Sequence, residues 1–382
     1  MKSRMSPWAG ALVVLVLVVA PCAVRAQGSL SVQGLGYPPG QFSARAMGTG
    51  GALAEFDPAS PVNPAALLEF GSAAVSVQMA PEFRRVTDGN NTASSSTQRF
   101  PVFIGALPFS DKFIVGVSSS TLLDRSWQTT SPQQQILNGD TVDFNSTTTS
   151  DGSVNDIAFT AAYMPVSWLR LGVAAHAING RDIVTTRLSF ADTVRYGNSV
   201  LPITNTFTGN ALSVGAELVE PSLGGLAVSF RRGGPFEQTV GDTLIARANV
   251  PDEFGLGLVY TGFTGTVLAF RTAYDSWSRL GTMDSASGTA MNSWDSSVGV
   301  EFTGPRLGEL PVALRVGSRW RDLPFPADGH QVREASLAGG LGFSMAQGHA
   351  SFDLGLVRMT RSAGIGISES AWTMNAGLTI RP

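Results

Sequence analysis

The sequence contains one cysteine, few charged residues and few histidines. Cys22 lies in an N-terminal stretch with the features of a secretory signal, so the mature chain would contain no cysteine. Disulfides, thiolate chemistry and cysteine metal sites are thereby excluded from the mature chain. Only 14% of the residues are charged, and the histidines are His176, His330 and His349. This composition offers little for acid-base or metal chemistry, so we predict no enzyme, no cofactor and no metal site.

Long apolar runs are missing after the signal. Residues 1–26 combine Lys2 and Arg4, an apolar run over 9–20 and a small-residue cleavage site ending at Ala26, which together predict a signal peptide. The mature chain has no apolar stretch of the roughly eighteen residues that a transmembrane helix needs. The mean hydropathy of the whole chain is nevertheless slightly positive. A secreted chain with this profile is typical of a transmembrane β-barrel.

A basic surface is also missing. Without the three basic residues of the signal peptide, 23 basic residues face 29 acidic ones, a net charge of −6. Nucleic acid is therefore not expected as a partner.

Alternating hydropathy supports the barrel. From Trp372 to Arg381, apolar residues at even positions alternate with polar or small residues at odd positions. Similar segments between 71 and 381 predict about fourteen strands. They are joined alternately by tight turns, such as 109–111, and by long polar loops, such as 127–152. This asymmetry is typical of a bacterial outer-membrane barrel with periplasmic turns and external loops. The barrel would occupy residues 71–382.

The stretch from Phe42 to Phe70 does not fit the strand pattern. Three glycines and three prolines exclude a long helix or a central strand. Apolar residues such as Leu53, Phe56 and Leu67 need a surface to pack against. A compact, half-apolar segment ahead of a barrel predicts a plug, which we assign to residues 27–70.

The same stretch resembles the N-terminal hatch of the FadL/TodX family of outer-membrane transporters for long-chain fatty acids and other hydrophobic compounds. A glycine-rich turn is followed by an aspartate with a small-residue pair and then by Asn-Pro-Ala. The residues that carry the resemblance are Arg45, Gly48, Gly50, Gly51, Asp57, Asn63, Pro64 and Ala65. The segments 250–258 and 310–317 resemble later hairpins of the family, whose barrels also have fourteen strands.

The resemblance implies passive uptake of long-chain fatty acids or other hydrophobic small molecules, captured among the outer loops, held near the plug and released sideways through a distorted strand. The candidate ligand contacts are apolar residues of the plug and of the predicted 127–152 loop: Leu53, Phe56, Leu67, Trp127, Ile136, Leu137 and Phe144. The candidate bend is the serine run Ser118, Ser119 and Ser120 in the third strand.

Two other functions remain open from the sequence. The same fold could anchor or assist the secretion of partner proteins at the cell surface. A lipid-modifying enzyme could use His176, which lies on the inward face of its strand. For the transporter, the expected partners are a hydrophobic ligand, outer-membrane lipids and the barrel assembly machinery during biogenesis, and we expect a monomer.

Overall fold

The computed structural model describes residues 30–89, 91–137, 140–193, 195–284, 289–306, 308 and 310–381. The predicted signal peptide, residues 1–26, lies outside the described residues. None of the helices in the described part of the chain is long and apolar enough to cross a membrane.

Eighteen antiparallel strands form one sheet, which closes on itself because β1 pairs with the last strand, β18. The strands of the first half are β1 Ala74–Met79, β2 Glu82–Asp88, β3 Asn91–Thr97, β4 Val102–Ser110, β5 Phe113–Asp124, β6 Trp127–Leu137, β7 Asp140–Val166, β8 Leu169–Phe190 and β9 Ser199–Glu220. Those of the second half are β10 Gly224–Val240, β11 Thr243–Asn249, β12 Glu253–Phe263, β13 Thr266–Asp275, β14 Ser293–Thr303, β15 Val312–Asp322, β16 Arg333–Met345, β17 Ala350–Ser362 and β18 Ile367–Ile380.

Four pairs of these strands each make up one strand of the barrel wall. β1 and β2 both pair with β18, β5 and β6 both pair with β7, and β11 and β12 both pair with β10. In the same way, β3 pairs with β2 and β4 pairs with β1. The eighteen strands therefore form fourteen strands of the wall, and the predicted fourteen-stranded antiparallel barrel is confirmed.

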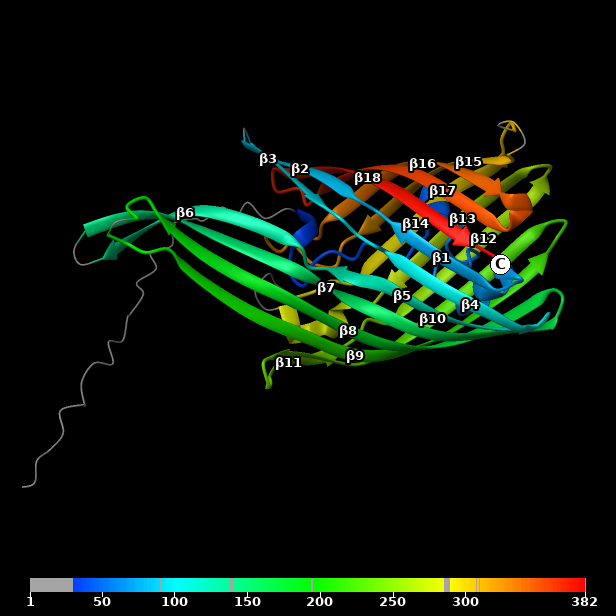
Figure 1. Cartoon of the computed structure of the whole chain (residues 1–382), viewed down its shortest axis with the longest axis horizontal. Helices are drawn as coiled ribbons and strands as arrows, with labels where there is room; N and C mark the ends of the chain where they lie inside the picture. The colour runs from blue at the N-terminus through cyan, green and yellow to red at the C-terminus, as the bar shows by residue number, and fades with distance from the viewer. Residues whose placement is uncertain are drawn as a thin grey trace, which may run out of the picture.

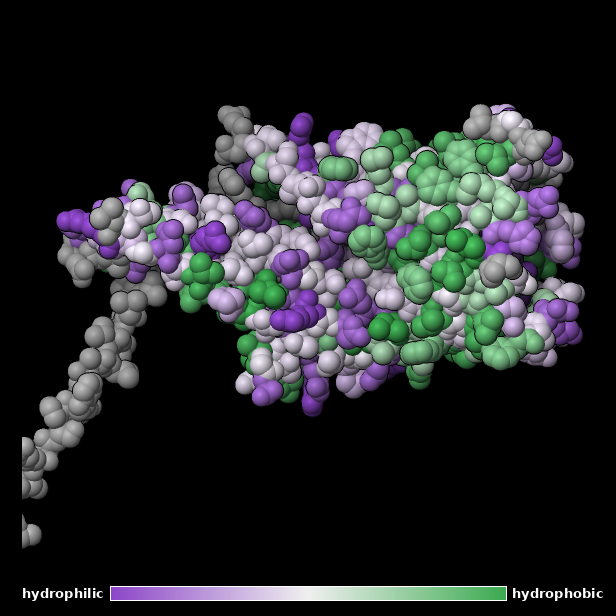
Figure 2. Space-filling model, viewed as in Figure 1, coloured by the Kyte–Doolittle hydropathy of each residue, from purple (hydrophilic) through white to green (hydrophobic). Residues whose placement is uncertain are grey.

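Apolar side chains face outward from the wall. Along β18, Trp372 and Met374 are exposed, whereas Thr373 and Asn375 are buried. Each barrel strand carries exposed large apolar residues, among them Val75, Phe103, Val117, Phe159, Val173, Val214, Val228, Leu258, Phe270, Val298, Val316, Leu337, Leu356 and Trp372. On the face shown in Figure 2, hydrophobic residues gather on the half of the barrel nearer the tight turns. An apolar band outside and a polar interior is the pattern of a barrel surrounded by lipid.

The half of the barrel farther from the tight turns differs from the prediction of long polar loops. Residues 127–152, predicted as a long loop, form β6 and the first part of β7, and the β6–β9 hairpins project beyond the rest of the barrel (Figure 1). Their threonines favour strands because they are β-branched. Thr148 and Thr186 also hydrogen-bond across the pair at 3.3 Å. Outside the apolar band neither face needs apolar residues, so the alternation that marks the other strands is absent.

Residues 30–70, which we call the N-terminal segment, lie inside the ring of strands (Figure 1). The segment contains η1 Leu30–Val32, α1 Ala44–Gly48 and η2 Pro64–Phe70. Ser43 and Asn63 cap the second and third of these helices through side-chain oxygens that accept from backbone N–H groups. Two further short helices, η3 Trp277–Asp284 and η4 Ala346–Gly348, lie in an outer connection and in a tight turn.

Candidate functional site

The residues of the predicted hatch motif hold the N-terminal segment together and tie it to the wall. Asp57 accepts hydrogen bonds from the hydroxyls of Ser43 and Ser60, the second at 2.7 Å. Asn63 accepts from the Ala65 N–H at 3.0 Å, and Pro64 begins η2. Gly50 and Gly51 have positive φ angles, which glycine adopts readily. The motif thus fixes the fold of the segment.

Arg45 connects the motif to the barrel. Its guanidinium donates two hydrogen bonds to Glu301 on β14, at 3.0 and 2.7 Å. Two parallel hydrogen bonds between these groups are stronger and more directional than a single one. Gly48 follows on α1 and packs against Arg315 and Gly340 of the wall.

Tyr37 is the centre of a charged network in the outer half of the lumen. Its hydroxyl donates to Glu334 at 3.0 Å and accepts from Arg361 at 2.8 Å. Arg321 also donates to this hydroxyl. The guanidinium of Arg99 lies 4.9 Å from the centre of the tyrosine ring, a distance at which the ring attracts a cation. The network joins the N-terminal segment to several strands at once.

A second charged group surrounds Glu55. Arg271 donates to Glu55 at 3.0 Å and to Asp295 at 3.3 Å. Burial raises the pKa of the Glu55 carboxyl, although the charge of Arg271 opposes that effect. Three further wall arginines, Arg231, Arg315 and Arg319, are buried like Arg271.

Two pairs of wall glycines let the N-terminal segment touch the barrel backbone. Gly172 and Gly215 are partners on β8 and β9, and a Cβ atom at Gly215 would lie 1.9 Å from Asn63 Oδ1. Gly299 and Gly317 are partners on β14 and β15, and a Cβ atom at Gly317 would lie 2.1 Å from the Thr49 carbonyl. Only glycine permits so close an approach at these positions.

We therefore expect Gly172→Val and Gly317→Val to displace the N-terminal segment while the wall still forms. Overpacking of this kind costs about 1–3 kcal/mol at each site. Limited proteolysis of the folded barrel should then cut within residues 30–70, which the wild type protects. Gly339→Val on β16 is the control, because its nearest neighbouring atom would be 3.9 Å away. Equal protection in all variants would contradict the expectation.

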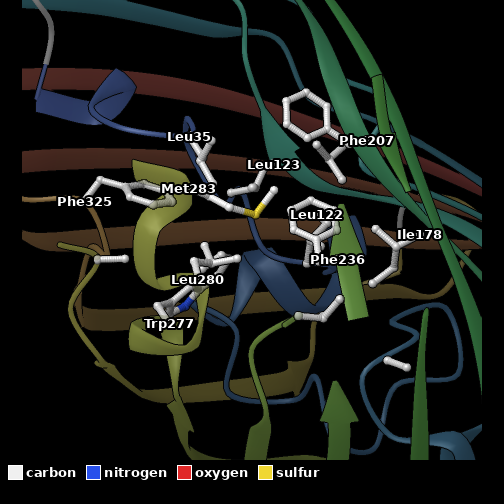
Figure 3. Packing of buried hydrophobic residues seen from close by; sticks show 14 residues of the cluster. Leu35, Leu122, Leu123, Ile178, Phe207, Phe236, Trp277, Leu280, Met283 and Phe325 are labelled. Atoms are coloured by element: carbon white, nitrogen blue, oxygen red, sulfur yellow. The ribbon is translucent and has the colours of Figure 1, made fainter. Parts of the chain in front are cut away.

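An apolar group of side chains fills one side of the outer lumen. We call it the lumenal apolar cluster, and Figure 3 shows its side chains converging from the wall, from the N-terminal segment and from η3. Its members are Leu35, Leu122, Leu123, Val154, Ile178, Phe207, Ala211, Phe236, Val250, Trp277, Leu280, Met283, Ala290 and Phe325. The inward face of the wall is otherwise largely polar, so the cluster is the part of the outer lumen suited to an apolar guest.

Aromatic rings and one cation define the geometry of the cluster. Phe207 and Phe236 stack with their centres 5.9 Å apart. The Arg125 guanidinium lies 4.9 Å from the centre of the Phe207 ring, and it donates to Asp182 at 3.0 Å and to the Leu35 carbonyl at 2.8 Å. The cluster thus combines a large apolar surface with one positive group at its edge.

The predicted plug contacts lie elsewhere. Leu53 packs against Ala52 and Ala269, and Leu67 packs in a separate cluster with Ile104 and Ile114. The Phe56 ring lies against Gly225 and Gly257 of the wall. These three residues fasten the N-terminal segment to the wall and are not brought together around a common space.

The predicted loop contacts are spread along the β6–β7 hairpin. Trp127 begins β6, and the Ile136 side chain is 72% exposed near the hairpin tip. Leu137 ends β6, and its side chain lies outside the described residues. Phe144 on β7 is buried and packs on Phe190, with ring centres 5.3 Å apart. The structure therefore does not bring the described side chains of Trp127, Ile136 and Phe144 together in one groove.

The wall has an opening close to the predicted bend. Ser118, Ser119 and Ser120 are paired with β4 and with β7, so the serines themselves are regular. The ladder shifts directly after them, between Thr121 and Leu123. β4 and β5 pair as far as Val102 and Ser120, and beyond that point no pairing in the described residues joins β3 to β6.

We call the resulting gap between β3 and β6 the side opening. It has a volume of about 440 Å³ and is lined by Ser94–Ser96 from one side and by Trp127 and Gln128 from the other. On the inner side of the opening, the N-terminal segment pairs with the free edge of β5. The backbones of Tyr37 and Asp124 exchange hydrogen bonds of 2.8 and 2.7 Å. The segment thereby covers the edge that β4 leaves unpaired.

His176 lies between Asp156 and Ser213. Its Nδ1 is 2.9 Å from an Asp156 oxygen and its Nε2 is 2.6 Å from the Ser213 hydroxyl. This order is that of a hydrolase triad, but the cavity beside His176 measures about 20 Å³, room for about one water. Gln41 of the N-terminal segment donates to Asp156 at 3.1 Å. Asp156 therefore binds the segment, and the space beside the His176 ring is too small for an acyl group in this conformation.

The sequence analysis missed the lumenal apolar cluster. A signal was present, because apolar residues interrupt otherwise polar inward faces: Ile178 follows His176 on the inward face of β8. Which strands carry such interruptions side by side depends on the register of the whole barrel.

Neither a protein-family model nor a curated protein sequence matches the chain. Among solved structures, a FadL homologue from Pseudomonas aeruginosa has a TM-score of 0.61 at 11% identity, covering 91% of this chain and 99% of that one. The CymD monoaromatic hydrocarbon channel has a TM-score of 0.54 at 13% identity, with 89% and 97% covered. The P. putida toluene transporter TodX has a TM-score of 0.55 at 13% identity, with 88% and 97% covered. These likenesses confirm the resemblance to FadL/TodX barrels at the level of the fold.

Proposed function

We propose that this chain is a bacterial outer-membrane transport protein through which long-chain fatty acids or other hydrophobic small molecules pass passively. The observation that carries the proposal is an apolar cluster inside a mostly polar barrel, next to an opening in the wall. The likeness to a hydrocarbon channel and a toluene transporter supports the same class of cargo.

The proposed route has three steps: entry, binding and release. A hydrophobic molecule enters from the outer end and binds at the lumenal apolar cluster, where it replaces contacts made by Trp277, Leu280 and Met283 of η3. A fatty acid would place its carboxylate near Arg125 at the edge of the cluster. The molecule then leaves by the side opening, whose neighbour Leu123 belongs to the cluster.

In this proposal the N-terminal segment acts as the plug. It blocks straight passage to the tight-turn end and covers the inner side of the side opening at Tyr37 and Asp124. The two backbone hydrogen bonds there contribute about 0.5–1.5 kcal/mol each. Their loss would uncover the exit if the Tyr37 side chain keeps its contacts with Glu334 and Arg361. The route needs no energy source in this proposal, because a hydrophobic molecule diffuses down its gradient.

The proposal also implies the partners of the barrel in the membrane. Outer-membrane lipids would contact the apolar band, and the barrel assembly machinery would insert the chain.

Identification of a bound molecule tests the function. Native mass spectrometry of membrane-extracted protein should release an apolar compound at near-stoichiometric amount. An empty barrel that retains a protein partner would instead favour an anchoring role, for which the projecting β6–β9 hairpins offer a surface (Figure 1).

Filling the side opening tests the route. We expect the double variant Ser95→Trp and Ser96→Trp to block release, because two indole rings occupy much of a space of about 440 Å³. Uptake of a labelled hydrophobic compound by cells expressing the variant should fall to the level of cells without the barrel, while binding to purified protein persists. Ser131→Trp, on β6 but outside the lining of the opening, is the control. Undiminished uptake by the double variant would refute lateral release here.

A further inference from the structure

The outer wall carries a shallow groove that the proposed transport does not use. It has a volume of about 690 Å³ and extends over outward-facing residues of β14 to β18 and β2. Its floor is made of short side chains, Ala335, Thr360 and Ser370, which are successive partners on β16, β17 and β18. Two of the three carry hydroxyl groups, so the floor is able to form hydrogen bonds.

Larger side chains form the two ends of the groove. Trp320 is the β15 partner of Ala335 and is 52% exposed, and Trp294 lies on the neighbouring strand β14. Arg85 on β2 is the partner of Ser370 at the other end and is exposed. The groove thus has an aromatic end and a cationic end, with a low hydroxyl-bearing floor between them.

The position of the groove relative to the apolar band indicates its depth in the membrane. The next outward-facing residues toward the tight turns are Leu337, Arg358, Trp372 and Phe83, again successive partners across β16, β17, β18 and β2. Three of these four are large, apolar and exposed. The groove therefore begins where the apolar band ends, at the level where lipid headgroups meet a barrel.

Arginines outnumber acidic residues in the lining of the groove, which contains Arg85, Arg321, Arg333 and Arg361 against Asp322, Glu334 and Glu369. Among the described residues, Arg85 has no carboxylate within ion-pair distance, and the Arg333 side chain is 86% exposed, with Asp322 its partner at 3.8 Å. Arg358 lies over the Trp372 ring, 5.2 Å from its centre. Exposed guanidinium groups next to hydroxyls at headgroup depth are suited to a phosphate.

We propose that the groove binds the phosphate-bearing headgroup of an anionic lipid in the outer leaflet of the membrane. Arg85 on β2 and Arg333 on β16 lie on opposite sides of the floor, and each binds a phosphate group of the headgroup. The floor hydroxyls bind the polar part of the headgroup, and the acyl chains lie along Leu337 and Phe83. The inference rests on the outer-membrane location proposed above, but it does not depend on the cargo or on its route.

Native mass spectrometry of the full mature chain tests this site, with a bis-phosphorylated glycolipid as the probe and its dephosphorylated form as the comparison. We expect the double variant Arg85→Gln and Arg333→Gln to bind the phosphorylated lipid roughly tenfold to thirtyfold more weakly, given the usual contribution of a basic residue near an anionic lipid. Ala335→Trp should also weaken binding, because it fills the floor without changing the charge.

The matched control is Arg181→Gln with Arg187→Gln, which removes the same charge from two exposed positions on β8. A loss of lipid in the control as large as in the groove variant would overturn the proposal, as would equal binding of the dephosphorylated lipid or an unaffected Ala335→Trp variant. Binding of a hydrophobic cargo should be unchanged in the groove variants, so failure of this proposal is distinguishable from failure of the transport proposal.

Discussion

Deletion of residues 27–70 should turn a closed barrel into an open, ion-conducting channel. The N-terminal segment fills the lumen of a wall whose interior is polar and charged, so its removal admits water. We expect the single-channel conductance in planar lipid bilayers to rise roughly tenfold or more over that of the full mature chain, the difference between a filled and an aqueous lumen.

The shortened barrel should still fold. Many of the wall's buried charges pair with one another as well as with the segment: Arg319 binds Asp295 at 2.6 Å, and Arg361 binds Glu334 at 2.5 Å. Should the deletion variant fail to insert, Gly172→Val and Gly317→Val in the full chain supply the same test with every residue retained. A folded, heat-modifiable barrel with a displaced segment and no conductance would disprove the role of the segment as a plug.

Leu123→Asp should abolish binding of hydrophobic compounds. Leu123 is 1% exposed within the lumenal apolar cluster, and an unpaired carboxylate there costs several kcal/mol in apolar surroundings. The variant would admit water to the cluster and remove the surface that an apolar guest needs. We expect the affinity for a fluorescent fatty acid, measured on detergent-solubilised protein, to fall by roughly a hundredfold or more.

Two further variants locate the binding site. Ile136→Asp introduces the same charge at an exposed position near the tip of the β6–β7 hairpin, and binding should be unchanged. Leu53→Asp places the charge among the contacts between the N-terminal segment and the wall. Loss of binding in the Ile136 variant with retention in the Leu123 variant would move the site from the lumenal apolar cluster to the outer hairpin.

The barrel could be predicted because the apolar band imposes a period of two on every strand that crosses it. The stretch from Trp372 to Ile380 shows that period in full, and its apolar residues are exposed as predicted. The outer half of β7 shows no such period, because polar residues occupy both of its faces: Thr147 hydrogen-bonds to the Thr130 hydroxyl, and its neighbour Thr148 hydrogen-bonds to the Thr186 hydroxyl. The hairpin was therefore predicted as a loop.

The site could be predicted only in part. The hatch motif is local in sequence, so Asp57, Asn63 and Gly50 could be recognised from their spacing. The lumenal apolar cluster joins Leu35, Leu123, Phe207 and Phe325, which meet only after the barrel has closed. No short sequence pattern predicts these contacts, because they depend on the register of many strand pairs.

The contacts of the N-terminal segment also constrain the order of folding. The Ser31 N–H donates to Glu369 at 3.1 Å, and Arg361 donates to the Tyr37 hydroxyl at 2.8 Å, across sequence separations of 338 and 324 residues. Contacts between the two ends of a chain form late, because nearly the whole chain must be ordered first. The residues at the start of the mature chain therefore reach their final positions last. A chain that ends before β18 would lack a closed wall and would lack Glu369, the partner of Ser31.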